Sequence, residues 1–231
     1  MSDAPVCRPL VVTTFLSVAI CWHSALAQEA EPPLPSEAIT AADVAWFFGG
    51  AAAAFLSHEA SHVVVNLALG NTPHLSGTST LGIPFFAIEP RITCNHGRCT
   101  KYDGRRFSAG PPGVFAIVAA GFTCQHVTDE IILTQEPALR FTAAPFRKGM
   151  LAFNTLTSIG YVFVNLAGVE SPNGDLGGLE SRASVPRGVL AALLLAPALL
   201  DLTRYYFPNL DVVPWVSRWM KTSLLGVTFT L

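Results

Sequence analysis

The chain has 231 residues, of which 51% are hydrophobic and only 13% are charged, and its formal net charge is -2. This composition is closer to that of a membrane protein than to that of a soluble enzyme. The near-neutral balance, without a basic face or a recognised nucleic-acid motif, argues against nucleic acid as a partner.

The first 27 residues have the features of a secretory signal peptide. Arg8 precedes an apolar run over residues 10 to 22, and an Ala-Leu-Ala sequence stands directly before Gln28 as a cleavage pattern. An uncleaved first membrane helix is the alternative, although the apolar run is short for a span. Residues 28 to 41 are rich in Pro and Glu, and we expect them to form a polar leader on the far side of the membrane.

Residues 42 to 69 form an apolar segment that is long enough to cross a membrane with tilt. Its second half carries the pattern H-E-x-x-H at His58, Glu59 and His62. Residues four apart lie on one face of a helix, so both imidazoles can bind one Zn²⁺ while Glu59 reaches the water that the metal activates. Chance spacing is the alternative, but ionisable side chains in a membrane-length helix are costly enough to indicate function.

A polar connection over residues 71 to 108 follows, with a strand-like piece at residues 83 to 88. It holds the densest cluster of positive charge in the chain, formed by Arg91, Arg98, Lys101, Arg105 and Arg106. The positive-inside rule places this connection in the cytoplasm, where Cys94 and Cys99 are predicted to stay reduced. A disulfide loop, or a second metal site with His96, is the alternative for these cysteines.

Further apolar segments lie at residues 109 to 133, 150 to 167 and 189 to 202, and the last is short and contains Pro197. We expect an all-α membrane protein, a polytopic helical bundle of three core spans with one or two less certain C-terminal segments. The membrane-embedded domain would cover residues 42 to 203. Residues 204 to 231 are expected to form an interfacial helix or another short span.

The far half of the segment at residues 109 to 133 is polar. It contains Gln125, His126, Asp129 and Glu130 within six positions. These side chains are expected at the far membrane interface or, as the second choice, in a water-filled cavity.

Three motifs stand in a characteristic order along the chain. They are His58-Glu59-x-x-His62 in a membrane helix, Gly110-Pro111 at the start of the next segment, and Asn165 followed by Pro172 and Asp175-Leu176-Gly177-Gly178 after the third. Over roughly residues 42 to 180 the chain resembles the site-2 protease family of intramembrane zinc metalloproteases. Asn165 and Asp175 are ten residues apart where the family usually has eight, and Leu176 precedes the glycine expected directly after the aspartate.

The resemblance implies a site whose residues can be named one by one. It makes His58, His62 and Asp175 the Zn²⁺ ligands and Glu59 the catalytic base, and it places Asn165 near the bound peptide. Asp129 or Glu130 is the alternative third ligand.

The function implied by the resemblance is the hydrolysis of peptide bonds in membrane-spanning proteins or remnant signal peptides. The protein would be a multi-pass protein of the lipid bilayer, and we expect a bacterial inner membrane. One rival is a membrane-embedded zinc hydrolase that acts on a lipid or a small amide. The other is a non-enzymatic scaffold whose histidines pair with a carboxylate in place of a metal. The sequence does not indicate an oligomeric state.

Overall fold

The computed structural model describes residues 38–80, 83–95, 97–169, 175–183, 185–208, 211–219 and 222–230. The predicted signal peptide and most of the predicted polar leader therefore lie outside the described residues. The same holds for the segment between residues 169 and 175, which contains Pro172 of the third motif.

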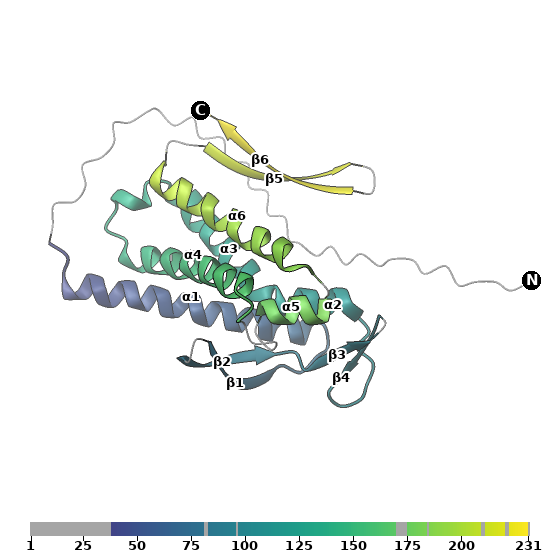
Figure 1. Cartoon of the computed structure of the whole chain (residues 1–231). Helices are drawn as coiled ribbons and strands as arrows, with labels where there is room; N and C mark the ends of the chain where they lie inside the picture. Colours follow the sequence, from purple (N-terminus) through teal and green to yellow (C-terminus); the bar gives the residue numbers. More distant parts are fainter. Residues whose placement is uncertain are drawn as a thin grey trace, which may run out of the picture. The chain divides into compact units, whose positions relative to one another are not determined.

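Long helical segments that pack side by side form the body of the described chain (Figure 1). They are α1 (Ala41–Ala68), the consecutive pair α2 (Gly110–Val118) and α3 (Ala120–Gln135), α4 (Pro145–Leu166) and α6 (Arg187–Tyr206). A single 3-10 turn, η1 (Leu139–Phe141), precedes α4, and the short helix α5 (Asp175–Ala183) lies between α4 and α6 in sequence. α1 starts with a capping box, in which Thr40 and Asp43 each bind the other's backbone N–H through their side chains.

The described strands form three separate antiparallel hairpins. They are β1 (His74–Thr80) with β2 (Ile83–Glu89), β3 (Ile92–Asn95) with β4 (Arg98–Lys101), and β5 (Asp211–Trp219) with β6 (Thr222–Thr230). The first two hairpins fill the connection between α1 and α2. The register pairs Leu75 with Ile88 in one of them and Cys94 with Cys99 in the other.

These elements contradict the prediction of an all-α polytopic bundle. Among the described residues, only α4 and α6 are long and apolar enough to cross a membrane. α1 has the length but falls short in hydropathy, because Asp43 and the ionisable residues of the H-E-x-x-H motif lie within it. The segment predicted as the second span is interrupted at Ala119, between α2 and α3.

The C-terminal segment also differs from its prediction. Residues 204 to 231 were expected to form an interfacial helix or a short span, but the structure ends α6 at Tyr206 and continues into the β5–β6 hairpin. The reason lies in the residue types, because valine, threonine, tryptophan and phenylalanine are frequent in this segment and favour strands over helices. With β1–β2 and β3–β4, this hairpin makes the described fold a mixed one.

Glycines bring α1 and α4 into backbone contact. A Cβ atom at Gly50 would overlap the carbonyl oxygen of Phe146, and one at Gly149 would overlap the carbonyl oxygen of Phe47. Farther along the same pair, Phe55 packs against the ring of Phe153. The small residues permit this close approach. The order of the contacts along the chain shows that the two helices run parallel, so their C-terminal ends lie at the same end of the helical body.

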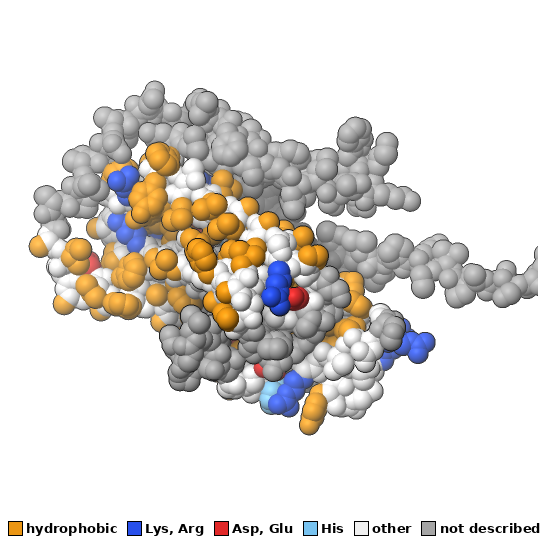
Figure 2. All heavy atoms as spheres, viewed as in Figure 1, with side chains coloured by type: hydrophobic (Ala, Val, Ile, Leu, Met, Phe, Trp, Pro, Cys, Tyr) orange, Lys and Arg blue, Asp and Glu red, His pale blue; other side chains and the backbone are white. Residues whose placement is uncertain are grey.

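The outer faces of the helices are apolar. Figure 2 shows hydrophobic side chains covering the helical part of the visible face. The exposed large apolar residues include Leu56, Val64 and Leu67 of α1, Val127 and Ile131 of α3, Leu156, Phe163 and Leu166 of α4, and Val189, Leu193 and Leu199 of α6. Soluble monomers rarely expose contiguous apolar surface on several elements, so this surface favours a lipid or protein environment.

Candidate metal centre

Three side chains from two distant parts of the chain meet where α1 and the start of α5 come together. His58 Nε2 lies 3.0 Å from Asp175 Oδ2, and His62 Nε2 lies 3.4 Å from Asp175 Oδ1. The two imidazole Nε2 atoms are 3.3 Å apart. His58 and His62 are buried, and Asp175 is largely buried, so the three donor atoms face one another away from bulk water.

This donor set fits a tetrahedral zinc ion. Ligand atoms about 2.0 to 2.1 Å from such an ion stand about 3.3 Å apart. The two imidazole Nε2 atoms have this spacing, and each lies 3.0 or 3.4 Å from one of the two carboxylate oxygens of Asp175. Two imidazole nitrogens and one carboxylate oxygen are also the ligand types of catalytic zinc sites, which leave a fourth position open. The cluster is one of two groups of His, Cys, Asp or Glu among the described residues that could hold a metal ion.

The ring of His62 is held in the orientation that a ligand needs. Its Nδ1 lies 2.7 Å from the carbonyl oxygen of Ile117, so Nδ1 carries the proton and Nε2 presents its lone pair to the cluster. Ile117 is in the last turn of α2, where carbonyl groups lack helical partners. The interruption between α2 and α3 thus supplies the acceptor that fixes the His62 tautomer.

The ring of His58 packs against the first turn of α3. A Cβ atom at Gly121 would overlap three atoms of the His58 ring, so only glycine leaves room for the imidazole. The Phe122 ring meets the same imidazole edge-to-face at a centroid distance of 5.3 Å. Packing therefore sets the position of His58, whose Nδ1 has no hydrogen-bond partner among the described residues.

Glu59 lies beside the two histidines and faces the β1–β2 hairpin. Its Oε2 accepts a hydrogen bond of 3.1 Å from the backbone N–H of Ile88 in β2. The hairpin is also attached to α1 through packing of Phe86 against Phe55, with ring centroids 5.1 Å apart. β2 therefore lies alongside Glu59 and Phe55 of α1, next to the candidate site.

A pair of asparagines ties the end of α1 to the strand connection. Asn66 donates to the carbonyl oxygen of His62, and Asn71 donates both to Asn66 Oδ1 at 2.6 Å and to the Pro90 carbonyl oxygen at 2.8 Å. Both amides are buried. This network holds the segment that follows β2 against the last turn of α1.

Asp175 begins α5, where the partial positive charge of a helix N-terminus favours a carboxylate. Burial raises its pKa, but the charge that His62 carries when both of its ring nitrogens are protonated, together with the hydrogen bonds to His58 and His62, outweighs burial and holds the pKa below its ordinary value. A metal cation in place of the Nε2 proton would act in the same direction. The group is therefore ionised at neutral pH, which is the state that a metal ligand requires.

The other residues named from the sequence are not among these three donors. Asn165 is buried near the end of α4, and its Oδ1 has no hydrogen-bond partner among the described residues. Glu130, an alternative third ligand, pairs with Arg204 at 2.5 Å. Asp129, the other alternative, accepts a hydrogen bond from Asn154 at 2.7 Å and belongs to a different cluster. It is 1% exposed, so the preferred membrane-interface position is wrong for this residue.

The two cysteines of the strand connection form a disulfide, so the prediction of reduced thiols is wrong. Cys94 and Cys99 face each other across the β3–β4 hairpin with their Cα atoms 4.1 Å apart. The positive-inside rule had predicted a reduced loop, but the hairpin register places both thiols on one face of two paired strands, where they can bond. Since such bridges persist in oxidising compartments, the cytoplasmic placement of this connection loses its support.

Several positioning groups were not found from the sequence. The Ile117 carbonyl and the Ile88 N–H are backbone groups, which carry no residue signature. Gly121 follows the Gly-Pro motif by eleven positions, and only its contact with His58 shows its role. Asn66 stands one helical turn after His62, a spacing that could have indicated it.

The chain was compared with known proteins at three levels. No protein-family model, curated protein or solved structure matches it. The resemblance to the site-2 protease family therefore stays a prediction that rests on the motifs.

Proposed function

We propose that the chain is a membrane-bound zinc peptidase whose metal ligands are His58, His62 and Asp175. The observation that carries the proposal is the convergence of these three side chains, whose closest nitrogen and oxygen atoms lie 3.0 to 3.4 Å apart, with Glu59 next to His58 in the sequence. A structural zinc site would have a fourth protein ligand. No fourth His, Cys, Asp or Glu joins this group among the described residues, which favours a catalytic site.

Bound zinc would supply Lewis-acid polarisation of a scissile carbonyl and activation of water. The chain's own residues do the rest. Glu59 accepts the proton of the attacking water and later passes it to the leaving amine. The Ile117 carbonyl keeps the proton of His62 on Nδ1, so that this imidazole stays a ligand throughout.

The edge of β2 that pairs with no described strand favours a peptide over a lipid or a small amide. The Ile88 N–H points to Glu59 and therefore away from β1, and in an antiparallel ladder the backbone groups of Phe86 point the same way. β1 is the one strand paired with β2 among the described residues. An extended substrate can add to this edge by backbone hydrogen bonds and bring a peptide bond to Glu59.

The apolar outer faces support a location in a lipid bilayer. α4 and α6 are long and apolar enough to cross it, and α1 and α3 carry exposed leucine, valine and isoleucine on their outer faces. A site at the end of such helices fits a substrate that enters from the bilayer. We therefore propose membrane-spanning proteins or remnant signal peptides as the substrate class.

The test compares the purified protein with its Glu59→Gln variant in lipid vesicles, on a quenched fluorescent peptide that contains a membrane-spanning segment. The amide cannot take a proton, so we expect hydrolysis to fall by about 10²-fold or more, with the zinc content unchanged. Glu89→Gln is the matched control, because Glu89 lies next to Ile88 at the end of β2 but accepts its hydrogen bond from Ser76. Retained hydrolysis in Glu59→Gln would refute the mechanism, and hydrolysis of lipid or amide substrates alone would refute the substrate class.

A further inference from the structure

A second buried cluster lies between α3 and α6. It consists of His126, Asp129 and Asp201, whose possible ligand atoms all lie within 4.8 Å of one another. Asp129 is 1% exposed and Asp201 is 5% exposed. No residue is shared with the candidate zinc site, whose donors come from α1 and α5.

Several polar atoms of this cluster have no protein partner. Among the described residues, neither ring nitrogen of His126 has a hydrogen-bond partner, and the same holds for Asp129 Oδ2. His126 Nδ1 and Asp201 Oδ2 lie 3.8 Å apart, which is too long for a hydrogen bond. Buried polar groups without partners are costly, and native structures usually satisfy them with water or an ion.

Among the described residues, no Lys or Arg side chain forms an ion pair with the two carboxylates of the cluster. Arg204 stands one helical turn after Asp201, but its guanidinium binds Glu130 at 2.5 Å and Thr134 at 3.1 Å. Two buried carboxylates without a cation between them cannot both stay ionised. A divalent cation among the three side chains would compensate both charges and take the free imidazole nitrogen.

We infer that His126, Asp129 and Asp201 form a second metal site, for a divalent transition-metal cation such as Zn²⁺. A mixed set of one imidazole and two carboxylates suits zinc, whereas Ca²⁺ and Mg²⁺ take oxygen ligands in larger number. Asn154 of α4 supports the site from outside, because its Nδ2 donates to Asp129 Oδ1 at 2.7 Å and orients that carboxylate. A metal bound by His126 and Asp129 of α3 and by Asp201 of α6 would link these two helices.

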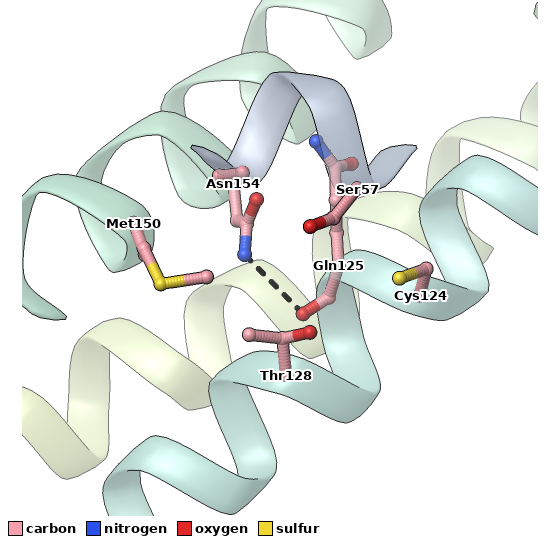
Figure 3. A pocket seen from close by; sticks show the side chains of 7 residues that line it. Ser57, Cys124, Gln125, Thr128, Met150 and Asn154 are labelled. Atoms are coloured by element: carbon pink, nitrogen blue, oxygen red, sulfur yellow. Dashed lines mark hydrogen bonds between the residues drawn. The ribbon is translucent and has the colours of Figure 1, made fainter. Parts of the chain in front are cut away.

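Asn154, which binds Asp129, also lines a small pocket that reaches Ser57 of α1 (Figure 3). Ser57, the residue before His58, lines this pocket together with Gln125 and Asn154. In Figure 3 the Asn154 amide points to the backbone oxygen of Gln125, at 3.4 Å. A metal at the second site would therefore hold α3 against α6. α3 carries Gly121, the residue packed on His58.

The experiment is a zinc count on the purified full chain after dialysis against a weak chelator. We expect two zinc ions per chain, and one in Asp201→Asn, which conserves side-chain volume but removes a charged ligand. Glu130→Gln is the control that keeps two, because Glu130 binds Arg204 outside the cluster. Should Asp201→Asn fail to fold, Asp129→Asn replaces it.

The inference does not depend on the proposed peptidase function, and the counts separate the two. His62→Ala should also hold one zinc ion, lost from the first site, and the double variant with Asp201→Asn should hold none. A single zinc ion in the wild type that persists in Asp201→Asn and disappears in His62→Ala would overturn the second site. A single ion that disappears only in Asp201→Asn would support the second site and refute the first.

Discussion

Adjacent glycines in α1 should respond in opposite ways to alanine, because only one of them contacts the backbone of α4. A Cβ at Gly50 would overlap the Phe146 carbonyl oxygen, and neither backbone can rotate away. A Cβ at Gly49 would instead meet Phe146 Cδ2 at 3.9 Å, an ordinary contact with a movable side chain. The pair therefore isolates the close approach of α1 to α4 from any general effect of alanine in the helix.

The magnitudes follow from two opposed terms. Alanine gains up to about 1 kcal/mol over glycine in a helix interior. Overpacking against a rigid neighbour costs about 1 to 3 kcal/mol or more, and a backbone neighbour falls at the upper end. Gly50→Ala should therefore destabilise the protein by about 2 kcal/mol net, whereas Gly49→Ala should stabilise it by up to about 1 kcal/mol.

Thermal unfolding in detergent, followed by circular dichroism, measures the difference. For a chain of this size about 1 kcal/mol corresponds to about 2 to 4 °C, so Gly50→Ala should lower Tm by about 4 to 8 °C. It should also weaken zinc retention, because α1 carries His58 and His62 past α4 to Asp175. Equal Tm values for the two variants would refute the helix contact described here.

The remaining predictions concern the His58 ring and the β3–β4 hairpin. Gly121→Ala should displace the imidazole of His58 and lower zinc affinity by about 10-fold or more, as changes in the shell around a metal do. The control Gly160→Ala adds a Cβ that meets nothing within 4 Å and should leave zinc affinity unchanged. Equal zinc affinities in the two variants would contradict the packing of His58 on Gly121. Mass spectrometry of a non-reduced digest should find Cys94 joined to Cys99, and ready labelling of both by an impermeant thiol reagent before reduction would contradict the disulfide.

Sequence periodicity predicted the first half of the site well. His58, Glu59 and His62 are brought together by the geometry of one helix, so their spacing alone places them on neighbouring positions. Asp175 is 113 residues after His62, and its proximity depends on the parallel packing of α1 and α4, for which no local pattern exists. It was reached only through the motif resemblance, and the structure brings it to both histidines.

The strand connection shows where local rules fail. Five basic residues predicted a cytoplasmic, reduced loop, but those charges lie on hairpins and turns whose register also pairs Cys94 with Cys99. The predicted membrane-interface position of Asp129 was wrong for a different reason. A polar half-helix is typical of a membrane interface, and only the packing of α3 against α4 and α6 shows that this carboxylate is buried beside Asn154 and Asp201.

The central claim is that His58, His62 and Asp175 bind zinc, and X-ray absorption at the zinc edge tests it most directly. The measurement is best made on Asp201→Asn, which leaves the first site as the one under study. We predict a four-coordinate ion with two imidazole nitrogens and oxygen ligands at about 2.0 to 2.1 Å, and loss of the signal in the same variant carrying His62→Ala. A zinc ion without imidazole scattering, or one that survives His62→Ala, would contradict the account.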